Sequence, residues 1–157
     1  MNEHYRFIEM TIRLAEEKML EGNGGPFGAL VVKNGKIIGT GFNRVTSTND
    51  PTAHAEIVAI RDACQHENTY QLNGCILYSS CEPCPMCFGA IYWARPDAYY
   101  FAATREDAAH AGFDDSFIYD EIIKPVEKRI IPVTVISHPD KNIPFEKWKE
   151  LADKLPY

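Results

Sequence analysis

Two short motifs, each at the predicted start of a helix, constrain the fold of this chain more than any other feature. One is His-Ala-Glu at residues 54–56, and the other is Pro-Cys-Pro-Met-Cys at residues 83–87. Cys84 and Cys87 lie three residues apart at a helix start, so both sulfurs can reach one ion, and the positive helix end favours thiolates. The motifs therefore predict a fold in which two helix N-termini meet at one metal ion.

The donor types in these motifs predict a catalytic zinc site. His54, Cys84 and Cys87 supply one imidazole nitrogen and two thiolates, and three such ligands leave the fourth position of a tetrahedral zinc ion open. Glu56 can move protons beside the metal without being a ligand. Two residues of an ideal helix span about 200° of rotation. His54 and Glu56 therefore converge only over the helix end, and Asp50-Pro51 predicts a helix start there.

Three other interpretations of the cysteines are weighed against this one. A closed structural zinc site would add Cys81 as a fourth ligand, but it leaves Glu56 without a role. An iron–sulfur cluster is suggested by the cysteine spacing of residues 81–87, but the nearby fourth cysteine of the bacterial pattern is missing. A thioredoxin-like dithiol needs neither His54 nor Glu56.

Composition limits the class of protein further. The 157 residues suffice for one compact domain, and 45% of them are hydrophobic, which is typical of a globular chain. Sixteen Lys and Arg against 22 Asp and Glu give a net charge of −6, which disfavours nucleic acid as a partner. We expect no signal peptide and no membrane span, hence a cytoplasmic protein whose five cysteines stay reduced.

The order of predicted elements indicates an α/β fold with helices on both faces of a mixed sheet of about five strands. Asn34-Gly35 predicts a tight hairpin, since both of its turn residues accept positive φ. Residues 85–94 are apolar nearly all round and are expected to form a buried helix. Further strands are predicted at 75–80, 97–103 and 131–137, further helices at 2–21, from Asp50 to about Cys64, and at 144–155, and short helical pieces within 105–128.

The two motifs together, H-x-E and P-C-x-x-C, are the signature of zinc-dependent nucleobase deaminases. Over nearly its whole length the chain resembles one branch of the cytidine deaminase-like superfamily, the bacterial guanine deaminases. The stretches that carry this resemblance are GGPFGA (24–29), NDPTAHAE (49–56), SCEPCPMCFGAIYWARP (80–96), AGFDDSFIY (111–119) and the terminal Tyr157.

The resemblance implies a single deaminase domain over 1–157 with a three-layer α/β/α sandwich fold, which converts guanine and water to xanthine and ammonia. It implies one Zn²⁺ per subunit, held by His54, Cys84 and Cys87, with Glu56 transferring protons. It also implies a homodimer in which a C-terminal segment, about 139–157, crosses to the partner. The implied substrate-binding residues are Phe27, Asn43, Ala55, Trp93 (from a neighbouring subunit), Asp115 and Tyr157.

Rival functions share parts of the pattern. The tRNA adenosine deaminases carry the same two motifs, but they must grip an RNA loop with basic and stacking surface. The net charge of −6 and the acidic pair Asp114-Asp115 argue against that substrate. A deaminase of guanosine or cytosine is a second rival. A non-catalytic zinc module is a third, against which the presence of Glu56 argues.

Overall fold

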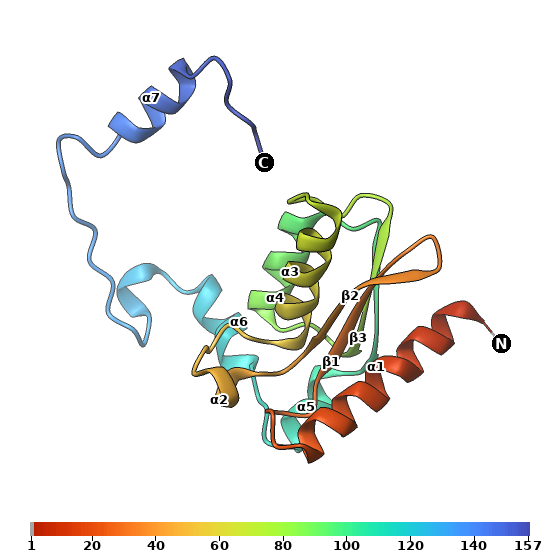
Figure 1. The fold of residues 1–157 in the computed structure, drawn as a ribbon. Coiled ribbons are helices and arrows are strands. Elements are labelled where there is room, and N and C mark those ends of the chain that lie inside the picture. Colours follow the sequence, from red (N-terminus) through yellow and green to blue (C-terminus); the bar gives the residue numbers. More distant parts are fainter. Residues whose placement is uncertain (1) are drawn as a thin grey trace. The chain divides into compact units, whose positions relative to one another are not determined.

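The computed structural model describes residues 2–157, which form two compact units (Figure 1). The first unit ends at Ser116, and the second runs from Phe117 to Tyr157. Within residues 2–157, no helix combines the length and the apolar character that crossing a bilayer requires.

The first unit is built on one mixed sheet with the strand order β2-β1-β3-β4. Its strands are β1 (Gly28–Lys33), β2 (Lys36–Phe42), β3 (Cys75–Cys81) and β4 (Ala98–Ala103). β1 pairs antiparallel with β2 and β3, whereas β3 and β4 are parallel. The mixed sheet is confirmed. The described residues contribute four strands rather than about five, because 131–137 form none.

The hairpin between β1 and β2 confirms the turn predicted at Asn34-Gly35. Asn34 has φ 51° and Gly35 has φ 73°, so both turn residues occupy the left-handed region. Such a turn matches the twist of the strands that it joins. The hairpin sets the register of β1, whose residue Ala29 pairs with both Gly41 and Ser79.

Helices cover both faces of the sheet, which confirms the three-layer fold (Figure 1). On one face lies α1 (Glu3–Leu20), where Phe7 packs in a cluster with Leu30 and Tyr78. On the other face lie α3 (Ala55–Glu67) and α4 (Pro85–Ala94), whose side chains pack with Val31 and Leu77. Because side chains alternate along a strand, the residues of β3 divide between the two clusters.

β2 and α3 approach each other so closely that only glycine fits at the contact. A Cβ added to Gly41 would lie 2.0 Å from the carbonyl oxygen of Ala55, and one added to Gly39 would lie 2.4 Å from that of Ala59. No side chain can replace hydrogen at such distances without moving the backbone. The two glycines therefore seat the first turns of α3 against the sheet, directly after His54.

The start of α3 differs from the sequence prediction, while the bounds of α4 agree with it. α3 begins at Ala55 with His54 as its N-cap. Asp50 instead closes a turn, because its carboxylate accepts hydrogen bonds from the backbone N–H and the hydroxyl of Thr52, at 2.8 and 2.7 Å. α3 also continues past Cys64 to Glu67.

The expectation that α4 is buried all round is wrong. Its outer side exposes three large aromatic side chains, with exposed fractions of 44%, 64% and 63% for Phe88, Tyr92 and Trp93. Two short helices that were not placed individually also belong to the first unit. They are α2 (Val45–Thr48) and α5 (Arg105–His110).

The second unit contains little regular structure. α6 (Ser116–Ile123) spans its start, the 3₁₀ helix η1 (Val126–Lys128) follows, and α7 (Ile143–Glu150) lies near its end. The strand predicted at 131–137 is absent, and the helix predicted at 144–155 ends early, at Glu150. Ile131, Val135 and Ile136 are exposed by 78%, 83% and 74%.

Candidate metal centre and active site

The candidate metal centre lies where the N-termini of α3 and α4 meet. His54 is the N-cap of α3 and Cys84 is the N-cap of α4, and both have extended backbone conformations. Neither side chain makes a capping hydrogen bond. Both side chains are therefore available to a shared ion instead of the ends of their own helices.

Three potential ligands converge there. Within residues 2–157, His54, Cys84 and Cys87 form a set whose donor atoms all lie within 4.8 Å of one another. The Nδ1 atom of His54 lies 3.5 Å from the sulfur of Cys84 and 3.5 Å from that of Cys87. In tetrahedral zinc, bonds of about 2.3 Å to sulfur and about 2.1 Å to nitrogen place the two donors about 3.5 Å apart. The set therefore fits Zn²⁺ in donor type and in spacing.

The electrostatics of the cluster favour a thiolate. The pKa of the Cys84 thiol falls to about 4, chiefly because Cys87 donates a hydrogen bond to it and then because of His54. The pKa of Cys87, the donor, is correspondingly raised. The hydrogen bond to Cys84 also raises the pKa of His54. Both sulfurs lie at the positive end of α4, which supports the anionic state that metal binding requires.

Cys81 is not part of this set. Its sulfur lies 3.6 Å from the carbonyl oxygen of Thr104, at the end of β4. Burial raises the pKa of the Cys81 thiol to about 11, which favours the neutral form. The geometry thus favours three protein ligands over the closed site of four.

Glu56 lies beside the ligands in the first turn of α3 and is only 6% exposed. Its Oε2 atom is 3.5 Å from the sulfur of Cys87, and its Oε1 atom accepts a hydrogen bond of 3.2 Å from the hydroxyl of Ser79. Burial raises the pKa of the Glu56 carboxyl. Because His54 precedes the helix and is extended, the helical rotation that would separate His54 from Glu56 does not apply.

The predicted purine-contacting residues of the first unit lie in different settings. Phe27 precedes β1 and is half-buried, with its ring edge-to-face against Phe113 at a centroid distance of 5.0 Å. Ala55 is fully buried at the first position of α3. Asp115 is half-buried, and its pKa is raised by burial and then by the charge of Cys84.

Asn43 has its side-chain oxygen bound by the backbone. Its side-chain carbonyl oxygen accepts hydrogen bonds from the backbone N–H groups of Gly25 and Val45, both at 3.2 Å. A side-chain amide can both donate and accept hydrogen bonds. Its acceptor is engaged in the structure, so the amide NH₂ is the group left to meet a ligand.

The structure does not bring Trp93 to the ligands of its own chain. Trp93 lies nine positions after Cys84 on α4, about 14 Å along the helix axis. Tyr157 ends the second unit and is 73% exposed.

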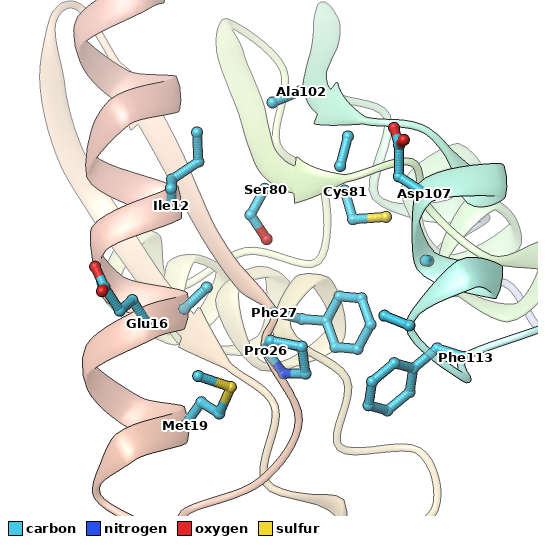
Figure 2. A pocket seen from close by; sticks show the side chains of 14 residues that line it. Ile12, Glu16, Met19, Pro26, Phe27, Ser80, Cys81, Ala102, Asp107 and Phe113 are labelled. Carbon is cyan, nitrogen blue, oxygen red and sulfur yellow. The ribbon is translucent and has the colours of Figure 1, made fainter.

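A largely apolar cavity of about 440 Å³ lies beside Phe27 (Figure 2). α1, the start of β1, the ends of β3 and β4, and α5 surround it, and Phe27, Ser80, Cys81 and Phe113 are among its lining residues. This cavity could not be predicted from the sequence, because its walls come from five separate segments with no common motif. Ser79 could not be predicted either, because it is a single small residue in a strand and has no spacing signal.

Comparison with known proteins finds extensive matches. The family model described as the cytidine and deoxycytidylate deaminase zinc-binding region matches residues 1–103. A guanine deaminase from Bacillus subtilis (strain 168) is 56% identical over 154 residues, which cover 98% of this chain and 99% of the relative. The X-ray structure of guanine deaminase from Bacillus subtilis superposes with a TM-score of 0.97, covering 100% of this chain and 99% of the other.

Two further matches cover less of the chain. A tRNA-specific adenosine deaminase from Aquifex aeolicus is 41% identical over 116 residues, which cover 73% of this chain and 75% of the relative. A solved structure of guanine deaminase from Nitrosomonas europaea is 34% identical with a TM-score of 0.66, covering 69% of this chain and 63% of the other. The fold is therefore the cytidine deaminase-like α/β fold, and the resemblance to bacterial guanine deaminases is confirmed.

Proposed function

The chain belongs to the cytidine and deoxycytidylate deaminase family. From that membership we propose that it converts guanine and water to xanthine and ammonia. The observation that carries the choice of guanine is the match to a guanine deaminase at 56% identity over 98% of the chain. The reaction class is supported by the three ligands and the buried Glu56 at the meeting point of α3 and α4.

His54, Cys84 and Cys87 would hold the zinc ion that this family carries, one per subunit. When bound, zinc supplies Lewis-acid chemistry, which lowers the pKa of a water molecule. The protein scaffold contributes two helix N-termini whose positive ends support the two thiolates. Because the ligands are the N-cap residues and a residue of the first turn, ligand positions follow directly from where α3 and α4 begin.

Glu56 moves the protons of the reaction. Its Oε2 atom faces the metal ligands, so this oxygen takes a proton from the attacking water as the new C–O bond forms at the carbon that bears the amine. Glu56 then delivers the proton to the adjacent ring nitrogen. Glu56 then takes the proton of the newly added hydroxyl group and passes it to the amine, so that the C=O bond of xanthine forms as the C–N bond breaks and ammonia leaves. Burial suits this role, because a raised pKa lets the carboxyl hold a proton between the steps.

Base recognition is assigned to residues around this centre. Guanine presents both N–H donors and acceptors, so its pocket needs partners of both kinds. Asn43 offers its amide NH₂ to an acceptor of the base, and the Asp115 carboxylate accepts from N–H groups. Phe27 supplies an aromatic face for the flat ring. Ala55 is also assigned to base recognition, although other atoms of the protein bury it completely in this structure. Trp93 and Tyr157 complete the pocket.

We propose that the protein is a homodimer, a single deaminase domain in which the segment of about 139–157 crosses to the partner. Support comes from unpartnered apolar surface. On and after α7, Phe145, Trp148 and Leu151 are exposed by 67%, 42% and 53%. A second copy offers the complementary apolar surface, namely the cavity beside Phe27 and the outer side of the edge strand β4. Trp93 would then reach the site of the neighbouring subunit.

We also propose a cytoplasmic location. All five cysteines are free thiols, and thiols of this kind persist in reducing compartments. The partners proposed are thus a small purine and a second copy of the chain, without nucleic acid or membrane.

One rival function is kept because of a specific observation. The 41% identity to a tRNA-specific adenosine deaminase over 73% of the chain includes the segment with both motifs. The net charge of −6 disfavours a polyanionic substrate, whose affinity depends on Lys and Arg contacts to phosphates.

A substrate panel tests the proposal. Zinc-loaded protein is incubated with guanine, guanosine, adenine, cytosine and a tRNA anticodon stem-loop, and ammonia release is measured. Turnover of guanine alone supports the proposed function. Turnover of the stem-loop would support the rival, and no release from any substrate would leave a non-catalytic zinc module as the better description.

A further inference from the structure

Ser79 is a buried hydroxyl that no catalytic assignment above uses. It lies on β3, is 1% exposed, and its Oγ atom is 3.2 Å from Oε1 of Glu56. A small polar residue in the middle of an apolar strand costs stability unless its hydroxyl is hydrogen-bonded. The Ser79 hydroxyl therefore needs a hydrogen-bond partner. In the structure that partner is Glu56, the proposed proton carrier.

The alternation of β3 directs Ser79 towards α3. Cys75 and Leu77 belong to the apolar cluster shared with α3 and α4, whereas Tyr78 belongs to the cluster under α1. Ser79 has the same parity as Cys75 and Leu77, so it continues their row up to Glu56. Ser80 faces the opposite side, where its hydroxyl accepts a hydrogen bond from the backbone N–H of Gly28 at 3.0 Å.

The other hydrogen bond of Ser79 indicates that its hydroxyl is the donor in the contact with Glu56. The Oγ atom of Ser79 accepts from the backbone N–H of Cys81 at 3.4 Å, and its own proton is left to donate to Oε1 of Glu56. An ionised carboxylate can only accept, so this direction suits the charged state of Glu56. The other oxygen, Oε2, then faces Cys87 and the metal ligands.

We propose that Ser79 is a positioning residue that holds Oε1 of Glu56, so that Oε2 is the oxygen that carries the proton. The inference rests on the proposed deamination, because it assigns a partner to the proton carrier of that reaction. Without the hydroxyl, Glu56 could rotate about its terminal bond and present either oxygen, or neither, at the reacting atoms. Holding one oxygen keeps the proton path short in every turnover.

Three substitutions at Ser79 test this, with Thr11→Val as the control for loss of a buried hydroxyl. Ser79→Ala removes the donor, Ser79→Cys keeps a similar volume with a much weaker donor, and Ser79→Thr keeps the hydroxyl in a residue that suits strands. Thr11→Val removes a fully buried hydroxyl of α1, on the opposite face of the sheet, which donates to the carbonyl oxygen of Ile8 at 2.7 Å. For each variant, kcat and KM for guanine, zinc per chain and the melting temperature are measured.

A hydrogen bond to a charged group that is lost in the transition state corresponds to a fall in kcat of about tenfold to hundredfold. We expect this fall for Ser79→Ala and Ser79→Cys, with KM within about twofold of wild type and zinc per chain unchanged. We expect Ser79→Thr to recover most of the lost kcat. Thr11→Val should lower the melting temperature but leave kcat within about twofold.

Several results would overturn the inference. These are wild-type kcat in both Ser79→Ala and Ser79→Cys, a loss of kcat in proportion to lost zinc, or an equal loss in Thr11→Val. If Ser79→Ala does not fold, the kcat values of Ser79→Cys and Ser79→Thr are compared instead, and equal values would overturn the positioning role of Ser79. Wild-type protein without any guanine turnover would overturn the proposed function, which is a different result from an active wild type that is indifferent to Ser79.

Discussion

Glu56 is buried beside three potential metal ligands, and its carboxylate lies outside the set that they form. The substitution Glu56→Gln keeps the shape and the ability to accept from Ser79, but it removes the ability to take up a proton. We expect zinc per chain to stay at the wild-type level while kcat for guanine falls by at least about a hundredfold, the usual size of a general acid–base contribution. Zinc analysis and ammonia release measure the two effects, and a variant with most of its activity would refute the role of Glu56.

Cys81 and Cys84 provide a matched pair for the ligand assignment. Both are cysteines close to one another in the chain, but only Cys84 lies in the three-residue set, while the sulfur of Cys81 faces the carbonyl of Thr104. We expect Cys81→Ser to retain roughly one zinc per chain and Cys84→Ser to lose most of it, because the latter leaves only two strong ligands. Metal content after exposure to a chelator measures the difference. Loss of zinc in Cys81→Ser would favour the closed site of four ligands.

At this scale, sequence analysis predicts the ligands better than it predicts their neighbours. The spacing of His54, Cys84 and Cys87 is informative because residues close together at the start of a helix direct their side chains to the same region of space. Ser79 and Phe113 reach the site through strand alternation and a loop, neither of which leaves a trace in local spacing. The contact of Ser79 depends on which face of β3 meets α3, a property of the assembled sheet.

At the scale of elements, the contact of β2 with α3 determines where the candidate ligands lie. In Gly41→Ala, the new Cβ would fall 2.0 Å from the carbonyl oxygen of Ala55, next to His54 and Glu56. Either the strand or the first turn of α3 must move, and overpacking of this kind typically costs about 1–3 kcal/mol of the free energy of unfolding. We expect a lower melting temperature and weaker zinc binding, measured by thermal unfolding with and without a chelator.

Gly89→Ala is the control for that substitution. Gly89 lies inside α4, and a Cβ added to it meets no atom within 4 Å. Alanine is favoured over glycine in a helix by about 0.5–1 kcal/mol, so this variant should melt at a higher temperature with its zinc content unchanged. If both variants melted alike, the close approach of β2 to α3 would not be the cause.

The elements that sequence analysis predicted correctly carry strong local signals. Asn34-Gly35 fixes its hairpin because few other residue pairs accept its turn, and the bounds of α4 follow from Pro85 and an apolar run. The start of α3 was placed too early because Asp50 binds Thr52, so its side chain caps a turn rather than a helix. A residue such as Asp50 can cap either a turn or a helix, and the sequence does not identify which. Only the folded backbone decides between these two structures.

At the scale of the whole molecule, the run at 131–137 shows why a strand prediction needs a partner. Its composition is that of a strand, yet Ile131, Val135 and Ile136 are largely exposed in the structure of one chain. A strand is stable only when a neighbour satisfies its backbone groups and covers its apolar side. In the dimer that we propose, a second copy would supply a further edge strand and further apolar surface for this run.

Mixing two impaired variants tests the proposed exchange directly. One variant is Glu56→Gln with an intact C-terminus, and the other retains Glu56 but lacks Tyr157. If the segment of about 139–157 crosses over, a mixed dimer contains one complete site, in which Glu56 of one chain meets Tyr157 supplied by the other. Random pairing from an equal mixture should then restore about a quarter of the wild-type sites. The variants are unfolded together and refolded, and guanine turnover is compared with that of each variant refolded alone.

The alternative arrangement predicts a different number. If Tyr157 serves the site of its own chain, every site in the mixed dimer lacks either Glu56 or Tyr157, and the mixture is no more active than the sum of its parents. Variants refolded separately and then combined provide the control, because exchange requires the chains to fold together. The exchange also requires a dimer, so sedimentation of the wild-type protein must give twice the chain mass. A monomer with full guanine turnover would refute both the dimer and the crossing segment, since a single chain would then suffice for the complete site.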